Sequence, residues 1–128
     1  MSALREIDAV RQIPGERRRR WFNSEHLDLY VWFTWWGAPT KFQLCYDKPR
    51  MEKALTWSRE FGFEHEKVDS GETEGLRHKE AAVLVPDGAV DARHVADIFA
   101  EAARSLPPRI SRFVMDKLTS HPSYGRGA

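Results

Sequence analysis

The apolar pattern of the chain is densest in residues 21–46, which hold nine of its fifteen aromatic residues. Within this segment, the aromatic and β-branched run 27–36 predicts a strand. Successive side chains of a strand point to opposite faces. The odd-numbered face would carry Leu27, Leu29, Val31, Phe33 and Trp35. The even-numbered face would carry Asp28, Tyr30, Trp32, Thr34 and Trp36. Because both faces hold bulky apolar side chains, we expect both to be covered.

A second strand, 40–46, is expected to form a hairpin with the first. A three-residue loop at 37–39 would place Tyr30 opposite Tyr46. The bulky side chains of the even-numbered face would then be Tyr30, Trp32, Trp36, Phe42, Leu44 and Tyr46. The pattern therefore predicts an aromatic patch on this face.

Turn signals divide the neighbouring segments into further strands. A Pro-Gly pair at 14–15 predicts a first hairpin. Residues 51–69 fit either a helix or two short strands, and we favour the strands. Residues 70–80 are polar and predict a loop, and 81–85 predict one more strand.

The C-terminal third changes to helical spacing. Asp91 is a typical N-cap for a first helix, and Pro107 ends it. The apolar residues of this helix are Val95, Ile98, Phe99 and Ala102. Pro108 suits the first turn of a second helix. The apolar residues of the second helix are Ile110, Phe113, Val114 and Leu118. Each set recurs at three- or four-residue spacing, so each helix should bury one face.

The length of 128 residues fits one domain. We expect an α+β domain over 1–120, with an antiparallel and mainly meander sheet followed by two helices packed on one face. The sheet should have about five to seven strands and could curl into a half-barrel. Residues 121–128 are expected to form a flexible tail.

The aromatic patch is the main functional signal. At roughly 150 Å² each, its five rings would cover about 750 Å², above the roughly 300 to 600 Å² that monomers usually expose. A curled sheet, a second copy of the protein or a small apolar ligand would each cover it. The sequence therefore predicts a non-catalytic binding or interaction protein. Its contact residues for a partner, a homodimer or a ligand would be Tyr30, Trp32, Trp36, Phe42 and Tyr46.

A basic run supports an alternative function. Arginines beside aromatic rings are typical of single-strand nucleic-acid binding. The residues concerned are Arg17, Arg18, Arg19, Arg20, Trp21 and Phe22. Alternate arginines of a strand point to opposite faces, so only two would act together. The chain has 20 basic and 19 acidic residues, and this balance argues against nucleic acid as the main partner. Polyanion binding is therefore the alternative.

Catalytic and metal-binding motifs are weak. The histidines are scattered without metal-ligand spacing, and no nucleotide-binding turn or nucleophile elbow occurs, so we expect no metal, cofactor or catalytic residue. A small enzyme would need His26, Asp28, His65 or Cys45 to converge. We expect Cys45 to be a small packing residue opposite Val31.

Cellular location is read from apolar runs and from cysteine usage. No apolar run is long enough to span a bilayer, so we expect no membrane partner. The N-terminus lacks the apolar core of a signal peptide. A single cysteine suits a reducing compartment. These features predict a cytoplasmic protein.

Five short segments carry a family resemblance. They are RRWF, DLYVWF, FQLCYDKP, ALTW and GFEHE, all between residues 10 and 70. Together they resemble a family of short, uncharacterised bacterial proteins. The resemblance implies a bacterial origin and brings no activity, cofactor or site residue with it.

Overall fold

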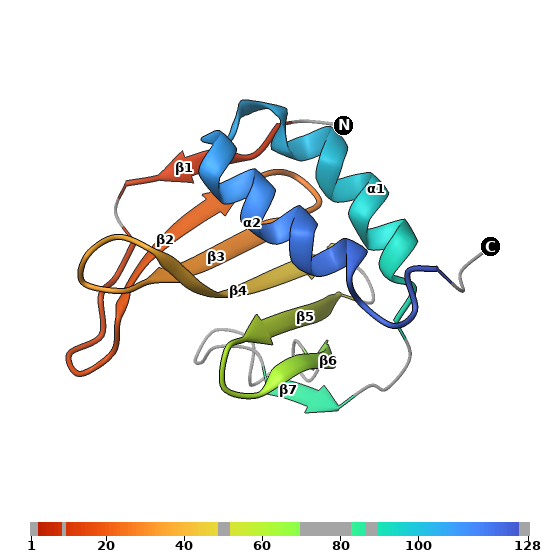
Figure 1. Cartoon of the computed structure of the whole chain (residues 1–128), viewed down its shortest axis with the longest axis horizontal. Helices are drawn as coiled ribbons and strands as arrows, with labels where there is room; N and C mark the ends of the chain where they lie inside the picture. Colours follow the sequence, from red (N-terminus) through yellow and green to blue (C-terminus); the bar gives the residue numbers. More distant parts are fainter. Residues whose placement is uncertain (1–2, 9, 49–51, 70–82, 87–89, 126–128) are drawn as a thin grey trace, which may run out of the picture.

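The fold combines one antiparallel sheet with two C-terminal helices. The computed structural model describes residues 3–8, 10–48, 52–69, 83–86 and 90–125. The strands are β1 (Arg5–Ile7), β2 (Arg18–Asn23), β3 (Asp28–Phe33), β4 (Pro39–Tyr46), β5 (Lys53–Ser58), β6 (Gly62–Asp69) and β7 (Val83–Pro86). The helical segments are α1 (Ala92–Ala102), the 3-10 turn η1 (Ala103–Ser105) and α2 (Pro108–Thr119). Strand order in the sheet follows chain order, and β1 and β7 do not meet (Figure 1). The predicted α+β meander is confirmed, and its sheet is not closed.

Local signals place both helices as predicted. The Asp91 side chain accepts a hydrogen bond from the backbone N–H of His94 and so caps α1. Pro108 occupies the first turn of α2, where its missing N–H costs nothing. Both helices lie across the same face of the sheet (Figure 1). We call this face the covered face.

The core lies between the helices and the covered face. The helices contribute side chains from one stripe each, including Val95, Phe99, Ile110, Val114 and Leu118. The sheet contributes Phe22, Leu29, Val31, Phe42, Leu44 and Leu55, all essentially without solvent exposure. The odd-numbered residues 27–33 are therefore buried as predicted, whereas Trp35 is not.

The register of the β3–β4 hairpin differs from the predicted one by three residues. Tyr30, expected opposite Tyr46, lies opposite Gln43, and Trp32 lies opposite Lys41. Since an odd shift exchanges the faces of one strand relative to the other, the predicted aromatic patch does not form.

Core packing gives the physical reason for this shift. The observed register pairs Leu29 with Leu44 and Val31 with Phe42, so apolar side chains from both strands share the covered face. The connecting loop is accordingly 34–38 and not 37–39. The predicted loop bounds were wrong, because β3 ends at Phe33 and the loop begins three residues earlier than expected.

The remaining strand predictions are confirmed where the structure describes them. Residues 53–69 form the β5–β6 hairpin, with Gly62 at a φ of 71° that favours glycine. The strand expected at 81–85 corresponds to β7. The loop expected at 70–80 lies outside the described residues.

Residues 121–125, assigned to the tail by the sequence, contact the body of the protein. The His121 ring meets Phe63 edge-on with 4.5 Å between centroids. The Ser123 hydroxyl accepts a hydrogen bond from the backbone N–H of Ala92. Arg93 lies over the Tyr124 ring, 4.6 Å from its centroid. The segment therefore packs beside the start of α1.

The opposite face of the sheet, which we call the open face, carries no helix in the described part of the chain (Figure 1). Trp21, Tyr30 and Trp32 are half-buried there. The second cover that the sequence predicts is not found among the described residues. None of the described helices has the length and apolar character needed to cross a bilayer.

Candidate functional site

Three connections lie at the same end of the sheet, because alternate connections of an antiparallel meander lie at the same end of the strands. They are the β1–β2, β3–β4 and β5–β6 connections, residues 8–17, 34–38 and 59–61. We call this region the turn end. The exposed large apolar side chains of the described residues are Ile13 (37% exposed), Trp35 (88%), Trp36 (65%) and Phe61 (72%). All four belong to the turn end, so exposed apolar surface is concentrated there.

The β3–β4 loop is held by several hydrogen bonds. The backbone N–H of Thr34 donates to the Ala38 carbonyl at 2.8 Å, and that of Gly37 donates to the Thr34 carbonyl at 3.0 Å. The Thr34 hydroxyl accepts from the Ala38 N–H at 2.9 Å. Arg109 of α2 donates to the Gly37 carbonyl. The loop is therefore fixed both internally and from the helix layer.

This fixed loop presents two adjacent tryptophans to solvent. The rings of Trp35 and Trp36 meet edge-on, with 5.3 Å between centroids and an interplanar angle of 84°. We call these two residues the Trp pair. Covering a large apolar side chain contributes roughly 1.5 to 3 kcal/mol. A ligand that covers the Trp pair would gain this free energy without first having to order the loop.

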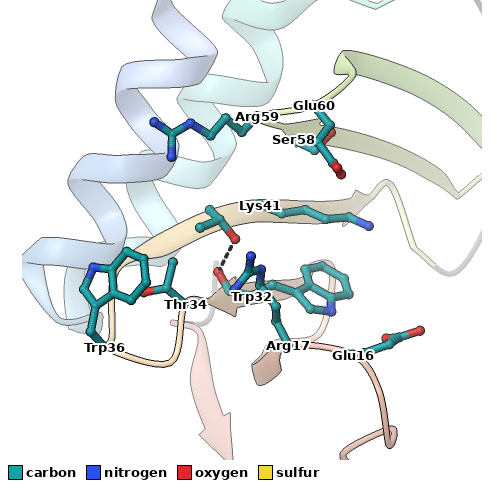
Figure 2. Close-up of a pocket in the computed structure, with 10 residues that line it drawn as sticks. Glu16, Arg17, Trp32, Thr34, Trp36, Lys41, Ser58, Arg59 and Glu60 are labelled. Carbon is teal, nitrogen blue, oxygen red and sulfur yellow. Dashed lines mark hydrogen bonds between the residues drawn. The ribbon is translucent and has the colours of Figure 1, made fainter.

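A groove of about 390 Å³ opens beside the Trp pair (Figure 2). Its size falls within the roughly 300 to 1,000 Å³ of ligand sites. The groove is lined by Glu16, Arg17, Trp32, Thr34, Trp36, Thr40, Lys41, Ser58, Arg59 and Glu60. Trp36 and Trp32 stand on opposite sides of it, and the side chains of Lys41 and Trp32 extend in the same direction. The groove therefore joins aromatic walls to charged groups of both signs.

A row of rings on the open face leads to the groove. Trp21 and Tyr30 stack with 5.7 Å between centroids and an interplanar angle of 7°, and Trp32 follows 6.2 Å from Tyr30. We call these three residues the aromatic ladder. The Arg19 guanidinium lies 5.8 Å from the Tyr30 centroid, and the Lys41 ammonium lies 4.6 Å from the Trp32 centroid. Burial raises the pKa of Tyr30 above its usual value of 10.0.

Asp28 anchors the far end of the aromatic ladder. Its carboxylate accepts from the Trp21 indole N–H at 2.9 Å and from the Asn23 amide at 2.7 Å. The Lys48 ammonium lies 2.7 Å from the second oxygen in a largely buried ion pair. One carboxylate thus fixes the orientation of Trp21 and connects β3 to the segment after β4.

The four candidate catalytic residues do not converge. Asp28 lies opposite Cys45 on the open face, so the expected contact between Cys45 and Val31 is wrong. His65 lies opposite Leu55 on the covered face. Its Nε2 is 2.5 Å from the Tyr46 hydroxyl.

The remaining chemistry of these residues is also unfavourable for a nucleophile. Burial raises the pKa of the Cys45 thiol to about 12, which keeps it protonated at neutral pH. His26 Nδ1 lies 3.3 Å from the Lys48 carbonyl.

Among the residues that the structure describes, no group of three His, Cys, Asp or Glu side chains is arranged to hold a metal ion.

The five residues predicted as one contact patch are divided among three places. Tyr30 and Trp32 lie on the open face, whereas Phe42 and Tyr46 are buried on the covered face. Trp36 lies in the β3–β4 loop. Trp32 and Trp36 still come together, because both line the groove.

The basic run is divided in the same way. Arg17 is exposed and lines the groove. The Nε of Arg19 donates to the Arg11 carbonyl at 2.9 Å. Arg20 donates two hydrogen bonds to the Glu6 carboxylate at 2.7 and 2.8 Å, which lowers the pKa of Glu6. Trp21 belongs to the aromatic ladder, and Phe22 is in the core. The run therefore does not act as one basic patch.

Sequence reasoning missed three parts of this site. The alternating pattern assigns Trp35 to the odd-numbered face, although its position two residues before Gly37 is a signal for exposure. Phe61 stands directly before a turn glycine, Gly62. Arg109 reaches the β3–β4 loop across 72 residues of chain, and no local pattern signals that contact.

Comparison with known proteins adds no relative to this description. The chain matches no protein-family model, and searches of the curated proteins and of the solved structures found no significant match. The geometry of the turn end and the open face is therefore the basis for a functional proposal.

Proposed function

We propose that the protein is a non-catalytic binding protein and that its contact surface is the turn end, continued by the aromatic ladder. The observation that carries the proposal is the Trp pair, two adjacent tryptophans on a hydrogen-bonded loop beside a groove. Tryptophan and arginine dominate the binding energy of many interfaces. Arg17 and Arg59 line the groove with Trp36, and Arg109 donates to the Gly37 carbonyl of the loop that carries the Trp pair.

The cost of keeping these rings in water supports a binding role. Exposed apolar side chains contribute little to folding, and clustered ones favour association. The four exposed apolar side chains of the described residues occur on three separate connections, so their exposure is not explained by the conformation of one loop. A ligand that spans the turn end would cover all of them together.

The proposal is tested by affinity capture from a lysate of the source organism. The Trp35→Ser/Trp36→Ser variant removes the Trp pair and leaves the core untouched. Ala100→Ser/Glu101→Ser is the matched control, because it changes two adjacent exposed residues of α1. Retained proteins are identified by mass spectrometry, and retained nucleic acid is quantified separately. We expect at least one molecule to be retained by the wild type and the control but lost from the Trp-pair variant.

Self-association is measured on the same proteins. If the ligand is a second copy, light scattering coupled to size exclusion will show a dimer for the wild type and a monomer for the Trp-pair variant. If neither capture nor oligomeric state depends on the Trp pair, the proposed function is wrong.

A further inference from the structure

We infer that the turn end binds single-stranded nucleic acid, with phosphates against Arg17 and Arg59 and bases stacked on Trp36 and Trp35. This inference rests on the binding role proposed above and names the class of ligand. It combines three independent features of the described residues: uneven charge, accessible rings and a concave site.

Charge is distributed unevenly, although the net charge is only +1. The groove lining holds three basic residues, Arg17, Lys41 and Arg59, and the Arg109 guanidinium donates to the adjoining loop. The acidic residues in the lining are Glu16 and Glu60. The lining has one more basic residue than acidic ones, and Arg109 adds a positive charge at the loop, so this end is locally positive. The overall balance therefore does not argue against a polyanion at this site.

Two carboxylates at the opposite end of the sheet are already paired with lysines. Asp28 pairs with Lys48 at 2.7 Å, and Asp47 lies 3.6 Å from Lys53. These lysines neutralise the two carboxylates locally, so neither carboxylate offsets the arginines at the groove. A polyanion would therefore be attracted to the turn end.

The rings at the turn end suit base stacking. Trp35 and Trp36 are mostly exposed, and their loop is already fixed. Every base has a flat π face, and stacking on an aromatic side chain is worth roughly 1 to 3 kcal/mol per base. Trp32 has the Lys41 ammonium over its ring, so it forms a wall of the groove beside a cation.

The concave shape favours a single strand over other polyanions. Arg17 and Arg59 both line the groove between Trp36 and Trp32, so an anionic group seated in the groove would lie between the two rings (Figure 2). A bilayer surface is too broad to enter such a groove. A duplex keeps its base faces stacked within the helix and cannot offer them to the Trp pair. A single strand supplies both flat bases and regularly spaced phosphates.

The test is fluorescence anisotropy with a labelled oligothymidylate of about 12 nucleotides, within the roughly 4 to 16 nucleotides that small binding folds occupy. We expect binding that weakens steeply with salt. The Arg17→Gln/Arg59→Gln variant should lower the slope of log affinity against log salt by about 1.4, because each single-strand phosphate contact contributes about 0.7. The Trp35→Ala/Trp36→Ala variant should bind at least about 5- to 150-fold more weakly, since this is the loss expected for each stacking contact removed.

Arg20→Gln is the matched control for charge. It removes one positive charge, half of what the double variant removes, but Arg20 lies on the covered face and pairs with Glu6. We expect this variant to keep the wild-type salt slope. A loss of about 0.7 in Arg20→Gln, equal to the loss per arginine in the double variant, would mean that the effect is only long-range charge and would overturn the inference.

Other outcomes separate the ligand class from the binding role. If oligothymidylate and oligouridylate do not bind in low salt while capture still depends on the Trp pair, the inference is wrong and the proposed function stands. Vesicles of phosphatidylserine and phosphatidylcholine and a 12-base-pair duplex are tested in parallel. Equal or tighter binding of either, with the same dependence on the Trp pair, would also overturn the inference.

Discussion

The two faces of the sheet hold their aromatic residues by different means. On the covered face, Phe22 and Phe42 are fully buried under the helices, and apolar contact stabilises them. On the open face, the aromatic ladder is half-buried and is oriented by the Asp28 carboxylate and the Lys41 ammonium. Polar contacts of this kind orient a ring and leave part of it accessible. The covered face therefore accounts for stability, and the open face with the turn end remains available for ligands.

The largest difference should appear when a phenylalanine ring is removed from the covered face and, separately, from the turn end. Phe42→Ala deletes a buried ring and should lower the free energy of unfolding by about 3 to 5 kcal/mol. Phe61→Ala deletes an exposed ring of the turn end and should change it by less than about 0.5 kcal/mol. Urea denaturation of both variants measures the contrast, and similar losses would contradict the distinction.

The next largest effect should come from the polar anchor of the aromatic ladder. Asp28→Asn removes the charge that faces the Lys48 ammonium, both groups being largely buried. Leaving one partner of such a pair unsatisfied costs about 1 to 3 kcal/mol. Asp97→Asn, at an exposed position of α1, is the matched control and should have no measurable effect. If both variants unfold at the wild-type urea concentration, Asp28 is not an anchor.

A smaller effect should appear at alkaline pH. Burial raises the pKa of the Cys45 thiol from its usual value of 9.0 to about 12. Between these pH values the unfolded chain loses the proton and the folded protein keeps it, so stability is present below pH 9 and falls as the pH rises. We expect this thiol to lower the free energy of unfolding by about 1 kcal/mol between pH 8 and pH 10.

The Cys45→Ala variant isolates this contribution. Tyr30, whose pKa is also raised, has the same sign of effect and is present in both proteins. The variant should therefore lose less stability than the wild type over the same pH range. Equal losses in urea titrations at pH 8 and pH 10 would show that Cys45 titrates normally.

The sequence predicted the features that depend on neighbouring residues. Asp91 and Pro108 signal helix starts through their own backbone chemistry, and both helices begin there. The meander follows because short turns join antiparallel neighbours. These signals need no knowledge of distant contacts, so the fold class could be predicted.

The site could be predicted only in part, since it depends on register and on distant contacts. A hairpin that closes at 34–38 and not at 37–39 shifts the pairing by three residues, and this odd shift moves Phe42 and Tyr46 away from Tyr30 and Trp32. The local sequence does not distinguish a loop at 34–38 from one at 37–39, and the packing of the strands under the helices decides between these two positions. The contact of Arg109 with the β3–β4 loop has the same long-range origin.

The central claim, that the Trp pair is kept for binding and not for folding, is tested most directly by the unfolding free energy of Trp35→Ser/Trp36→Ser. We predict a change of less than about 0.5 kcal/mol from the wild type, as for other exposed positions. A loss of more than about 2 kcal/mol, comparable with a core substitution, would contradict the claim and make the Trp pair part of the folded core.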